Sequence, residues 1–234
     1  MASSPEFQAC VANEVAIVHA NVERDLSRTL KLLEEVGDRS RNYTCADVNM
    51  TTTEETVREY KWDAGAYRAA SKPRHLPVKV FLEEPSAKIM VIDDFVTEEE
   101  CTQLMRRAES TGLTKASVNS DDGGSTLSPA RRAMAGAVDP DLSNRKDPVT
   151  QLFERGFAFA EDVTGYGMAL EGQEGFSVIK YDPTDEYRPH CDGDCTGVAY
   201  KPGGRVCTMV VYCEAPKYGG ATTFSSADVY VKGQ

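Results

Sequence analysis

A histidine and an aspartate one residue apart, His190 and Asp192, are the side chains in this sequence best suited to hold a metal ion. In a strand, residues i and i+2 point to the same side, so an imidazole nitrogen and a carboxylate oxygen would face one ion. Cys191 between them would face the opposite side. Two histidines and one carboxylate on one face of an octahedral ion are typical of non-haem iron(II) oxygenases. The pair predicts a metal site, but a lone His-x-Asp is common by chance.

The residues around this pair make the prediction more specific. Tyr181 stands nine residues before His190, and the runs GGRVCTMVVY and GGATTF follow the pair. This order resembles the prolyl 4-hydroxylase family pattern, and KIMVIDDFVTEEEC upstream resembles the strand, turn and helix that open the same domain. The resemblance covers roughly residues 78 to 234 and is poorest in the loop around residues 115 to 147.

Five residues receive roles from this resemblance. It implies that His190 and Asp192 bind Fe(II), and that the hydroxyls of Tyr181 and Thr222 contact the distal carboxylate of 2-oxoglutarate. A carboxylate in a narrow barrel needs hydroxyl donors and a cation, so these residue types suit the role. Tyr187, three residues before His190, is expected to line the site of the peptide substrate.

The reaction implied by the resemblance is hydroxylation of a peptidyl proline at C4. It converts 2-oxoglutarate and dioxygen into succinate and carbon dioxide, and ascorbate keeps the iron reduced. The metal centre supplies the oxidising chemistry, while the protein supplies geometry and a dry pocket. A proline-containing peptide or protein is the expected partner. For Arg205 we favour a structural role, a carboxylate pair that holds strand ends, over attraction of the anionic co-substrate.

The sequence departs from the family pattern in its histidines, which are His19, His75 and His190. The family pattern has a second ligand histidine several strands after the HxD, followed by a basic residue for the co-substrate, and no histidine follows His190 here. We therefore expect a domain that is incomplete at its C-terminus and binds metal more weakly. Asp228 is a remote substitute ligand. We interpret His75 as exposed and His19 as a residue of a helix.

Three alternatives stay open at this point. The first is a zinc site of His190, Cys191, Cys195 and Cys213, which we disfavour because adjacent strand residues point apart. The second is a catalytically inactive truncated pseudo-enzyme that keeps a peptide groove and acts as a binding module. The third is a related hydroxylase with a non-proline substrate.

An N-terminal extension, residues 1–77, is expected to precede the domain, which spans residues 78–234. Apolar residues recur every three or four positions over 8–36, which predicts an amphipathic helix. A polar linker follows, with a short helix expected around residues 53–70. This part of the chain is therefore predicted to be helical.

The domain itself is predicted to be α+β, with helices followed by a run of strands. Thr97 and Glu100 form a capping box that opens a helix, which Gly112 ends. Asp147-Pro148 opens a second helix, which continues to about Gly165. Residues 117–130 are rich in Gly, Ser and Asp and predict a loop. The predicted strands are VKVFL, KIMVIDDF, FSVIKY, RVCTMVVYC and ATTFSS. By the family resemblance they belong to a double-stranded β-helix, a jelly roll flanked by helices and incomplete at the C-terminus.

Composition excludes some partners. The chain has 234 residues and a formal net charge of -11, which disfavours nucleic acid and membrane surfaces as partners. The N-terminus does not match a secretory signal, so we expect a cytoplasmic location. The seven cysteines are odd in number and irregularly spaced, and in that location they are expected to be reduced thiols.

Overall fold

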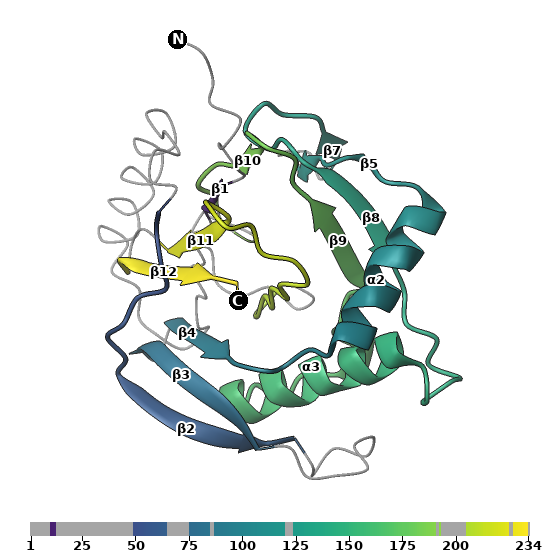
Figure 1. Cartoon of the computed structure of the whole chain (residues 1–234). Coiled ribbons are helices and arrows are strands. Elements are labelled where there is room, and N and C mark those ends of the chain that lie inside the picture. The colour runs from purple at the N-terminus through teal and green to yellow at the C-terminus, as the bar shows by residue number, and fades with distance from the viewer. Residues whose placement is uncertain are drawn as a thin grey trace.

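The computed structural model describes residues 10–12, 49–64, 75–84, 87–119, 124–190, 192, 205–224 and 227–233. Helices and mostly antiparallel sheets combine in these residues, so the expected α+β class is confirmed (Figure 1). Within the same ranges, no helix is both long and apolar enough to cross a bilayer.

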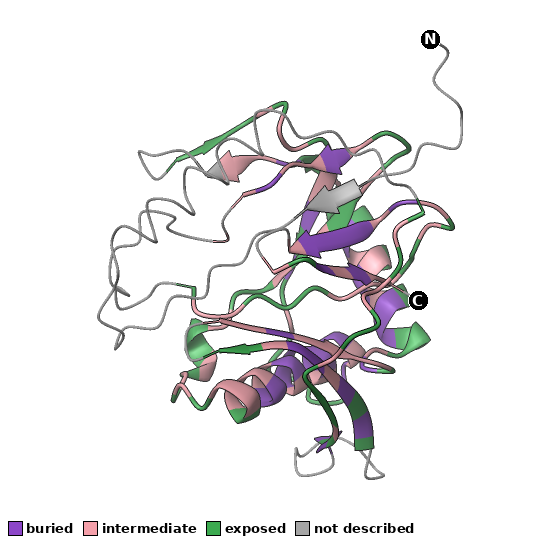
Figure 2. Ribbon diagram, turned by 90° about the vertical axis from the view of Figure 1, so that its left-hand side faces the viewer, coloured by how far each residue is buried: buried purple, intermediate pink, exposed green. Residues whose placement is uncertain are grey.

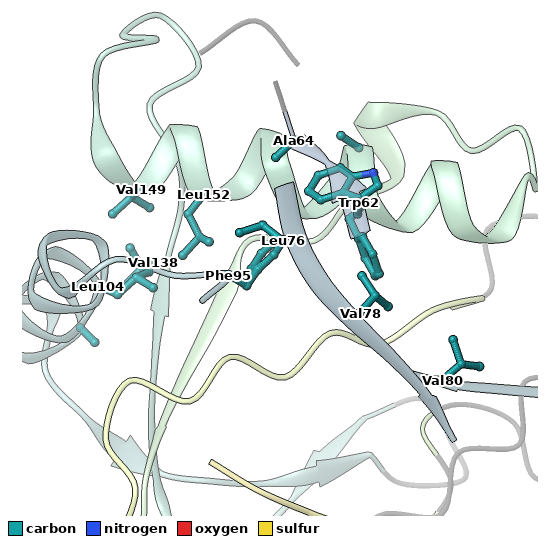
Figure 3. Packing of buried hydrophobic residues seen from close by; sticks show 13 residues of the cluster. Trp62, Ala64, Leu76, Val78, Val80, Phe95, Leu104, Val138, Val149 and Leu152 are labelled. Carbon is teal, nitrogen blue, oxygen red and sulfur yellow. The ribbon is translucent and has the colours of Figure 1, made fainter. Parts of the chain in front are cut away.

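The first sheet is an antiparallel meander of β2 (Arg58–Asp63), β3 (His75–Glu84) and β4 (Ala87–Ile92). The strands predicted at VKVFL and KIMVIDDF are confirmed as β3 and β4. Leu76, Val78 and Val80 alternate along β3 with more exposed residues, and all three are buried. Figure 3 shows these side chains in the packed interior, beside Trp62.

The helix predicted around residues 53–70 is wrong, because the structure has β2 there. Trp62 pairs with Leu76 across the sheet and is 6% exposed, whereas its neighbours Lys61 and Asp63 are exposed. This is a period of two, and burial of Trp62 against β3 outweighs the local helix propensity. The first sheet therefore includes residues that we expected to belong to the N-terminal extension.

The two predicted helices are confirmed as α2 (Glu98–Thr111) and α3 (Pro148–Thr164). Thr97 and Glu100 form the capping box of α2, and Asp147 caps α3 through the amide of Thr150. Gly165 ends α3 in the left-handed conformation with a φ of 63°, which glycine adopts without a steric penalty.

The main core lies where α3 packs against the first sheet. Trp62, Phe95 and Phe159 form an aromatic cluster, with ring centroids 5.1 to 6.3 Å apart. Leu152 of α3 is 1% exposed in the same core. Burying one such side chain stabilises the fold by about 1.5–3 kcal/mol. Figure 2 shows buried residues gathered on the inward sides of the helices and sheets.

A second antiparallel sheet has the order β5 (Thr114–Lys115), β8 (Met134–Val138) and β9 (Phe176–Lys180). The strand predicted at FSVIKY is confirmed as β9. At Gly136 of β8, an added Cβ would lie 2.9 Å from Leu113 and 3.3 Å from the Ala108 carbonyl, so glycine lets α2 approach this sheet closely. The predicted loop over residues 117–130 contains only the two-residue strands β6 (Val118–Asn119) and β7 (Ser125–Thr126) in its described part.

The third sheet has the order β10 (Glu186–Tyr187), β1 (Cys10–Ala12), β11 (Ala221–Phe224) and β12 (Val229–Lys232). The strand predicted at ATTFSS is confirmed as β11. The helix predicted over residues 8–36 is wrong at Cys10–Ala12, where the backbone pairs with β10 and β11, and the rest of it lies outside the described residues. Pairing on both sides of β1 satisfies its backbone groups, which outweighs the helical period.

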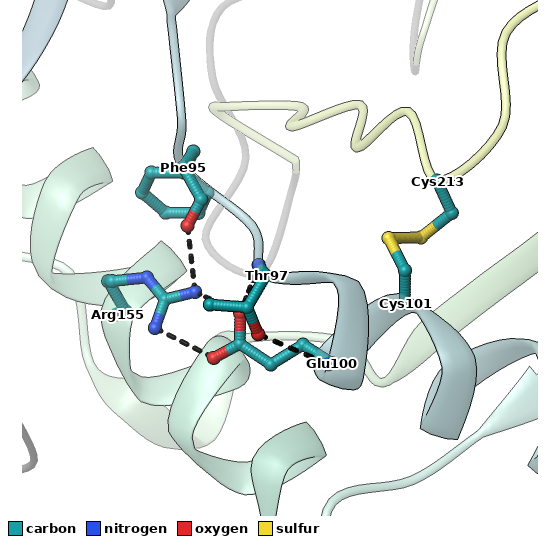
Figure 4. Close-up of a disulfide and its surroundings, with 6 residues drawn as sticks. All are labelled: Phe95, Thr97, Glu100, Cys101, Arg155 and Cys213. Carbon is teal, nitrogen blue, oxygen red and sulfur yellow. Dashed lines mark hydrogen bonds and ion pairs between the residues drawn. A yellow bond between two sulfur atoms is a disulfide. The ribbon is translucent and has the colours of Figure 1, made fainter.

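The strand predicted at RVCTMVVYC is also wrong, because residues 205–213 pair with no strand in the described part of the chain. A disulfide between Cys101 of α2 and Cys213 holds this segment, with Cα atoms 5.2 Å apart (Figure 4). Nearby, Arg155 of α3 pairs with Glu100 at 2.7 Å and donates to the Phe95 carbonyl at 2.8 Å. The expectation of reduced thiols is therefore wrong for Cys101 and Cys213, because the fold brings them within bonding distance.

Candidate functional site

His190 and Asp192 lie just beyond β10, in irregular backbone rather than in the strand that we predicted. Their side chains nevertheless converge, with 3.1 Å between His190 Nε2 and Asp192 Oδ1. These side chains are 17% and 20% exposed, so the site is accessible but mostly covered. The short strand ends at Tyr187, and the turn after it brings the two side chains together.

The backbone fixes the tautomer of His190. Its Nδ1 lies 2.8 Å from the carbonyl oxygen of Arg188, and a carbonyl can only accept a hydrogen bond. Nδ1 therefore carries the proton, and in the neutral imidazole Nε2 presents a lone pair. That lone pair faces the Asp192 carboxylate, which is also an acceptor. Two acceptors at this distance need a proton or a metal cation between them.

The spacing of these two atoms suits an octahedral cation. Neighbouring ligands with bonds of about 2.1 Å at right angles are about 3.0 Å apart. The observed 3.1 Å between Nε2 and Oδ1 matches that separation. An imidazole nitrogen and a carboxylate oxygen are also donors that Fe(II) accepts. The residues present therefore fit the metal that the family resemblance implies.

The carboxyl group of Asp192 is held in its ionised form. Burial raises its pKa, but without a metal ion a protonated His190 opposes this through its hydrogen bond and charge, together with the Thr208 hydroxyl and the Arg205 guanidinium. The net result is a pKa below the ordinary value of an aspartate. The group is thus a carboxylate at neutral pH, as a metal ligand must be.

Tyr187 of β10 fixes the ring of His190. The two rings are stacked, with centroids 3.6 Å apart and an interplanar angle of 19°. The Arg131 guanidinium lies over the same tyrosine ring, 4.6 Å from its centroid. Groups this close to one ring centre must occupy opposite faces, so Tyr187 lies between Arg131 and His190. The substrate-lining role of Tyr187 stays a prediction.

The two residues predicted to contact 2-oxoglutarate, Tyr181 and Thr222, lie near a third hydroxyl, that of Tyr212. Burial raises the pKa of Tyr181 to about 12, Arg131 opposes the rise, and nearby Tyr187, Asp185 and Tyr212 add to it. The Tyr212 hydroxyl makes a short hydrogen bond with that of Thr222, which is 3% exposed. Buried and partly buried hydroxyl groups thus gather in the neighbourhood of the predicted co-substrate residues.

Backbone register connects the two halves of the site. Strand β1 lies between β10 and β11, and Val11 is the register partner of both Tyr187 and Thr222. Adjacent strands are about 4.8 Å apart, so these two positions are separated by about 10 Å. Tyr187, which stacks on the predicted iron ligand His190, and Thr222, a predicted co-substrate residue, therefore belong to one sheet.

Arg205 forms the carboxylate pair that we predicted. Its Nε and Nη2 donate to the two oxygens of Glu174 at 2.6 and 2.7 Å. This bidentate pair joins the segment before β11 to the loop before β9. Its charge also acts on Asp192, as noted above.

Three residues of this neighbourhood were not predicted as site residues. Thr208 and Tyr212 belong to the GGRVCTMVVY run that carries part of the family resemblance, but neither was assigned a role in the site. Arg131 lies in the loop that fits the family pattern least, so no sequence signal marked it. The match of the run to the family pattern was the signal available for Thr208 and Tyr212, while Arg131 needed the structure.

The alternative ligands receive no support from the described residues. In that part of the chain, no three His, Cys, Asp or Glu side chains converge, so Asp228 joins no such group. Its carboxylate accepts a hydrogen bond from the Tyr230 hydroxyl at 2.8 Å instead. Cys213 is in a disulfide, which removes it from the alternative zinc site. Cys191 and Cys195 lie outside the described residues. His75 is exposed, as interpreted.

Comparison with known proteins gives a consistent set of relatives. Seven curated proteins match, and all are named as prolyl 4-hydroxylases, some as probable ones. Prolyl 4-hydroxylase 5 of Arabidopsis thaliana is 30% identical over 151 residues, covering 64% of this chain and 48% of the relative. Prolyl 4-hydroxylase 1 of the same plant is 29% identical over 143 residues, covering 61% and 48%. The chain spans about half the length of the curated relatives it matches. No family model and no solved structure matches it.

Proposed function

Because the chain belongs to a prolyl 4-hydroxylase-type family, we propose that it forms part of an Fe(II)- and 2-oxoglutarate-dependent dioxygenase. The proposed reaction is 4-hydroxylation of a proline in a peptide or protein, with release of succinate and carbon dioxide. The relatives carry that activity in their names, and it comes to this chain as a proposal. The proposed scaffold is a jelly roll, as the family resemblance implies.

One observation carries the proposal. The Nε2 lone pair of His190 faces the carboxylate of Asp192 at 3.1 Å, with Nδ1 committed to the Arg188 carbonyl. A divalent cation between the two acceptors would remove their repulsion. His190 and Asp192 would thus hold the iron. Bound Fe(II) would supply the oxidising chemistry of the reaction.

The other residues of the site would prepare it for substrates. Tyr187 would keep the His190 ring in the plane that points Nε2 at the ion, because the two rings are stacked. The hydroxyls of Tyr181 and Thr222 would donate to the distal carboxylate of 2-oxoglutarate. Ascorbate would keep the iron reduced, as the family resemblance implies.

The compartment is a separate proposal. The N-terminal sequence predicts a cytoplasmic location, whereas the Cys101–Cys213 disulfide favours an oxidising compartment. We propose the oxidising compartment, because a disulfide forms and persists there. Differential alkylation of free and reduced thiols in the protein from its native source tests this directly.

An anaerobic titration with Fe(II) and 2-oxoglutarate tests the proposed function. The wild-type chain is expected to develop a visible charge-transfer band, and Asp192→Asn is expected to lose it while remaining folded. Asp182→Asn is the matched control, because Asp182 is exposed in the same turn region and should leave the band intact. Absence of the band in a folded wild-type chain would contradict the proposal. The next function to test would then be peptide binding without catalytic turnover.

If the band forms, the substrate is decided by succinate release. Turnover that depends on a proline-containing peptide supports prolyl hydroxylation. Turnover with another peptide or a free amino acid, but not with proline, would point to a related hydroxylase. Mass spectrometry of the product locates the added oxygen.

A further inference from the structure

A small cleft lies at the end of the second sheet where β8 stops and β9 starts. It is formed by residues from 139–142 after β8, by residues from 170–175 before β9 and by Phe153 of α3, and its volume is about 270 Å³. Pockets that enclose a whole small molecule are usually larger, about 300–1,000 Å³. The cleft therefore has room for one long side chain of a partner.

This cleft is separate from the neighbourhood of His190. β8 and β9 pair along their length, and Val138 opposite Phe176 lies at the end next to the cleft. Lys180 lies at the other end of β9, about 14 Å along the strand, and the chain continues from there to Tyr181 of the candidate site. The cleft thus belongs to the opposite end of the sheet, and the proposed reaction does not use it.

The walls of the cleft are mainly apolar and are held in place. Phe153 is 4% exposed and packs edge-on against Phe176, with ring centroids 6.0 Å apart. Leu142 is 51% exposed, so apolar surface remains uncovered at the mouth. Gln173 joins the loop before β9 to α3, because its Nε2 donates to the Phe153 carbonyl at 3.1 Å. The cleft therefore has its shape before any ligand arrives.

Two carboxylates line the same cleft, those of Asp139 and Glu171. Both residues are exposed, and neither forms a salt bridge with another residue in the described part of the chain. Arg145, in the connection that follows Asp139, already pairs with Glu154 at 3.0 Å. A cleft with apolar walls and charges of one sign focuses the electric field and attracts ions of the opposite sign. The cleft therefore favours a cation.

A side chain that fits this cleft needs an apolar stem and a positively charged end. Arginine and lysine both have methylene groups before the charge. Arginine suits two carboxylates better, because its planar guanidinium presents five N–H donors, whereas an ammonium is a compact point charge. Arginine is also enriched at protein–protein interfaces, where lysine is depleted. The net charge of -11 adds a general attraction for a basic partner.

We propose that this cleft docks an arginine side chain of a partner polypeptide. The methylene groups would pack against Leu142 beside Phe153, and the guanidinium would pair with Asp139 and Glu171. One such anchor binds weakly by itself, so neighbouring residues of the partner would supply the rest of the affinity. The site is independent of the proposed dioxygenase reaction.

An NMR titration of the whole chain with short peptides tests the proposal. The probes are capped peptides with glycines on both sides of a central arginine, citrulline or norleucine. The arginine peptide is expected to bind with a Kd of about 1 mM and to shift the amide resonances of Leu142 and Gly175. The citrulline peptide keeps the shape without the charge, and the norleucine peptide keeps only the apolar stem. Both are expected to bind at least about threefold more weakly.

Variants of the two carboxylates show whether they recognise the charge. Asp139→Asn combined with Glu171→Gln should weaken binding of the arginine peptide by about three- to tenfold, because both charges are removed with little change in shape. Glu109→Gln is the matched control, since Glu109 is an exposed carboxylate on α2 and its change should leave the affinity as it is.

Four results would overturn the proposal. These are equal affinity of the wild type and the double variant for the arginine peptide, equal affinity of the wild type for the arginine and citrulline peptides, resonance shifts that avoid both Leu142 and Gly175, and no binding by the folded wild type at about 20 mM peptide. If the double variant does not fold, Glu171→Gln alone changes one exposed side chain, and its affinity for the same peptides decides the question.

Discussion

The region around α2 and α3 differs from the region around β10 to β12 in the length of its elements and in the interactions that hold them together. The first has helices of 14 and 17 residues, capped at both ends, and a strand of ten residues that pairs with a neighbouring strand on each side. The second has strands of two to four residues, supported by ring stacking and by hydroxyl hydrogen bonds, and a disulfide links it to α2 of the first region. Stability is thus built mainly in one region and chemistry in the other.

The contrast has a physical reason. Side chains that face a buried apolar interior gain free energy from burial alone, without requiring specific partners. Side chains that must hold an ion or a carboxylate have to remain partly unpaired, which costs stability. Short strands and irregular backbone let the polar groups of the site point inward, while the helical region supplies the stability that they do not.

The largest expected effect comes from the core of the helical region. Leu152→Ala should lower the free energy of unfolding by about 2–5 kcal/mol, because it leaves a cavity beneath the first sheet. The protein that remains folded should still bind metal through Asp192. Leu142→Ala is the control, since Leu142 is 51% exposed and its loss should change stability by less than about 0.5 kcal/mol. Urea unfolding of both variants, with metal titration of the folded fraction, checks the prediction.

The disulfide is the covalent link between the two regions, and its removal should have the next largest effect. Cys101→Ser combined with Cys213→Ser should lower the free energy of unfolding by about 2–4 kcal/mol, because the link restricts the unfolded chain. Cys207→Ser is the control, because Cys207 is a free thiol. Chemical denaturation with and without a reductant measures both. If the double variant and the wild type unfold at the same denaturant concentration, the disulfide does not contribute to stability.

Within the site, Tyr187 offers a test of positioning. Tyr187→Leu should weaken metal affinity by about tenfold, because the His190 ring loses the surface that orients it. Tyr187→Phe keeps the stacked ring and should bind metal as the wild type does. Competition between the protein and a chromophoric chelator for Mn(II) gives both affinities. If Tyr187→Phe also binds Mn(II) more weakly than the wild type, the Tyr187 hydroxyl, and not the stacking, supports metal binding.

The smallest effect concerns acid stability of the helical region. Burial raises the pKa of Asp147, but hydrogen bonds from Arg107 and Thr150 outweigh it, and the net pKa lies below the ordinary value. A carboxyl whose pKa is lower in the folded state stabilises the protein fully above its unfolded pKa of about 3.9 and ceases to do so as pH falls through the folded pKa. Below about pH 4, the free energy of unfolding of Asp147→Asn should therefore fall less steeply with pH than that of the wild type. Unfolding curves from pH 6 to pH 3 measure the difference.

The helical region was largely predictable because its signals are local. The capping box at Thr97, Pro148 at the first helical position and the two closing glycines mark helix ends within a few residues. The strands β3, β4, β9 and β11 carried a clear pattern of β-branched and aromatic residues. β2 was missed because a polar segment hides a period of two that becomes visible only when Trp62 meets Leu76.

The sequence predicted that the side chains of His190 and Asp192 converge, but it did not predict the residues that support them. His190 and Asp192 were found from spacing, although by an argument about strands that the backbone does not follow. The link between Cys101 and Cys213 and the place of Arg131 depend on contacts between distant residues, which no local pattern records. Residues 205–213 looked like a strand because apolar alternation does not tell whether a partner strand is present.

The disulfide also sets an order of events during synthesis. Its two cysteines are 112 residues apart, so translation at about 5–20 residues per second exposes Cys101 for roughly 6 to 22 s before Cys213 is made. Five other cysteines, Cys10, Cys45, Cys191, Cys195 and Cys207, are made before Cys213 and offer wrong partners in that interval. The nascent chain must therefore keep Cys101 reduced until the end, or exchange an early pair for the native one through a mixed disulfide.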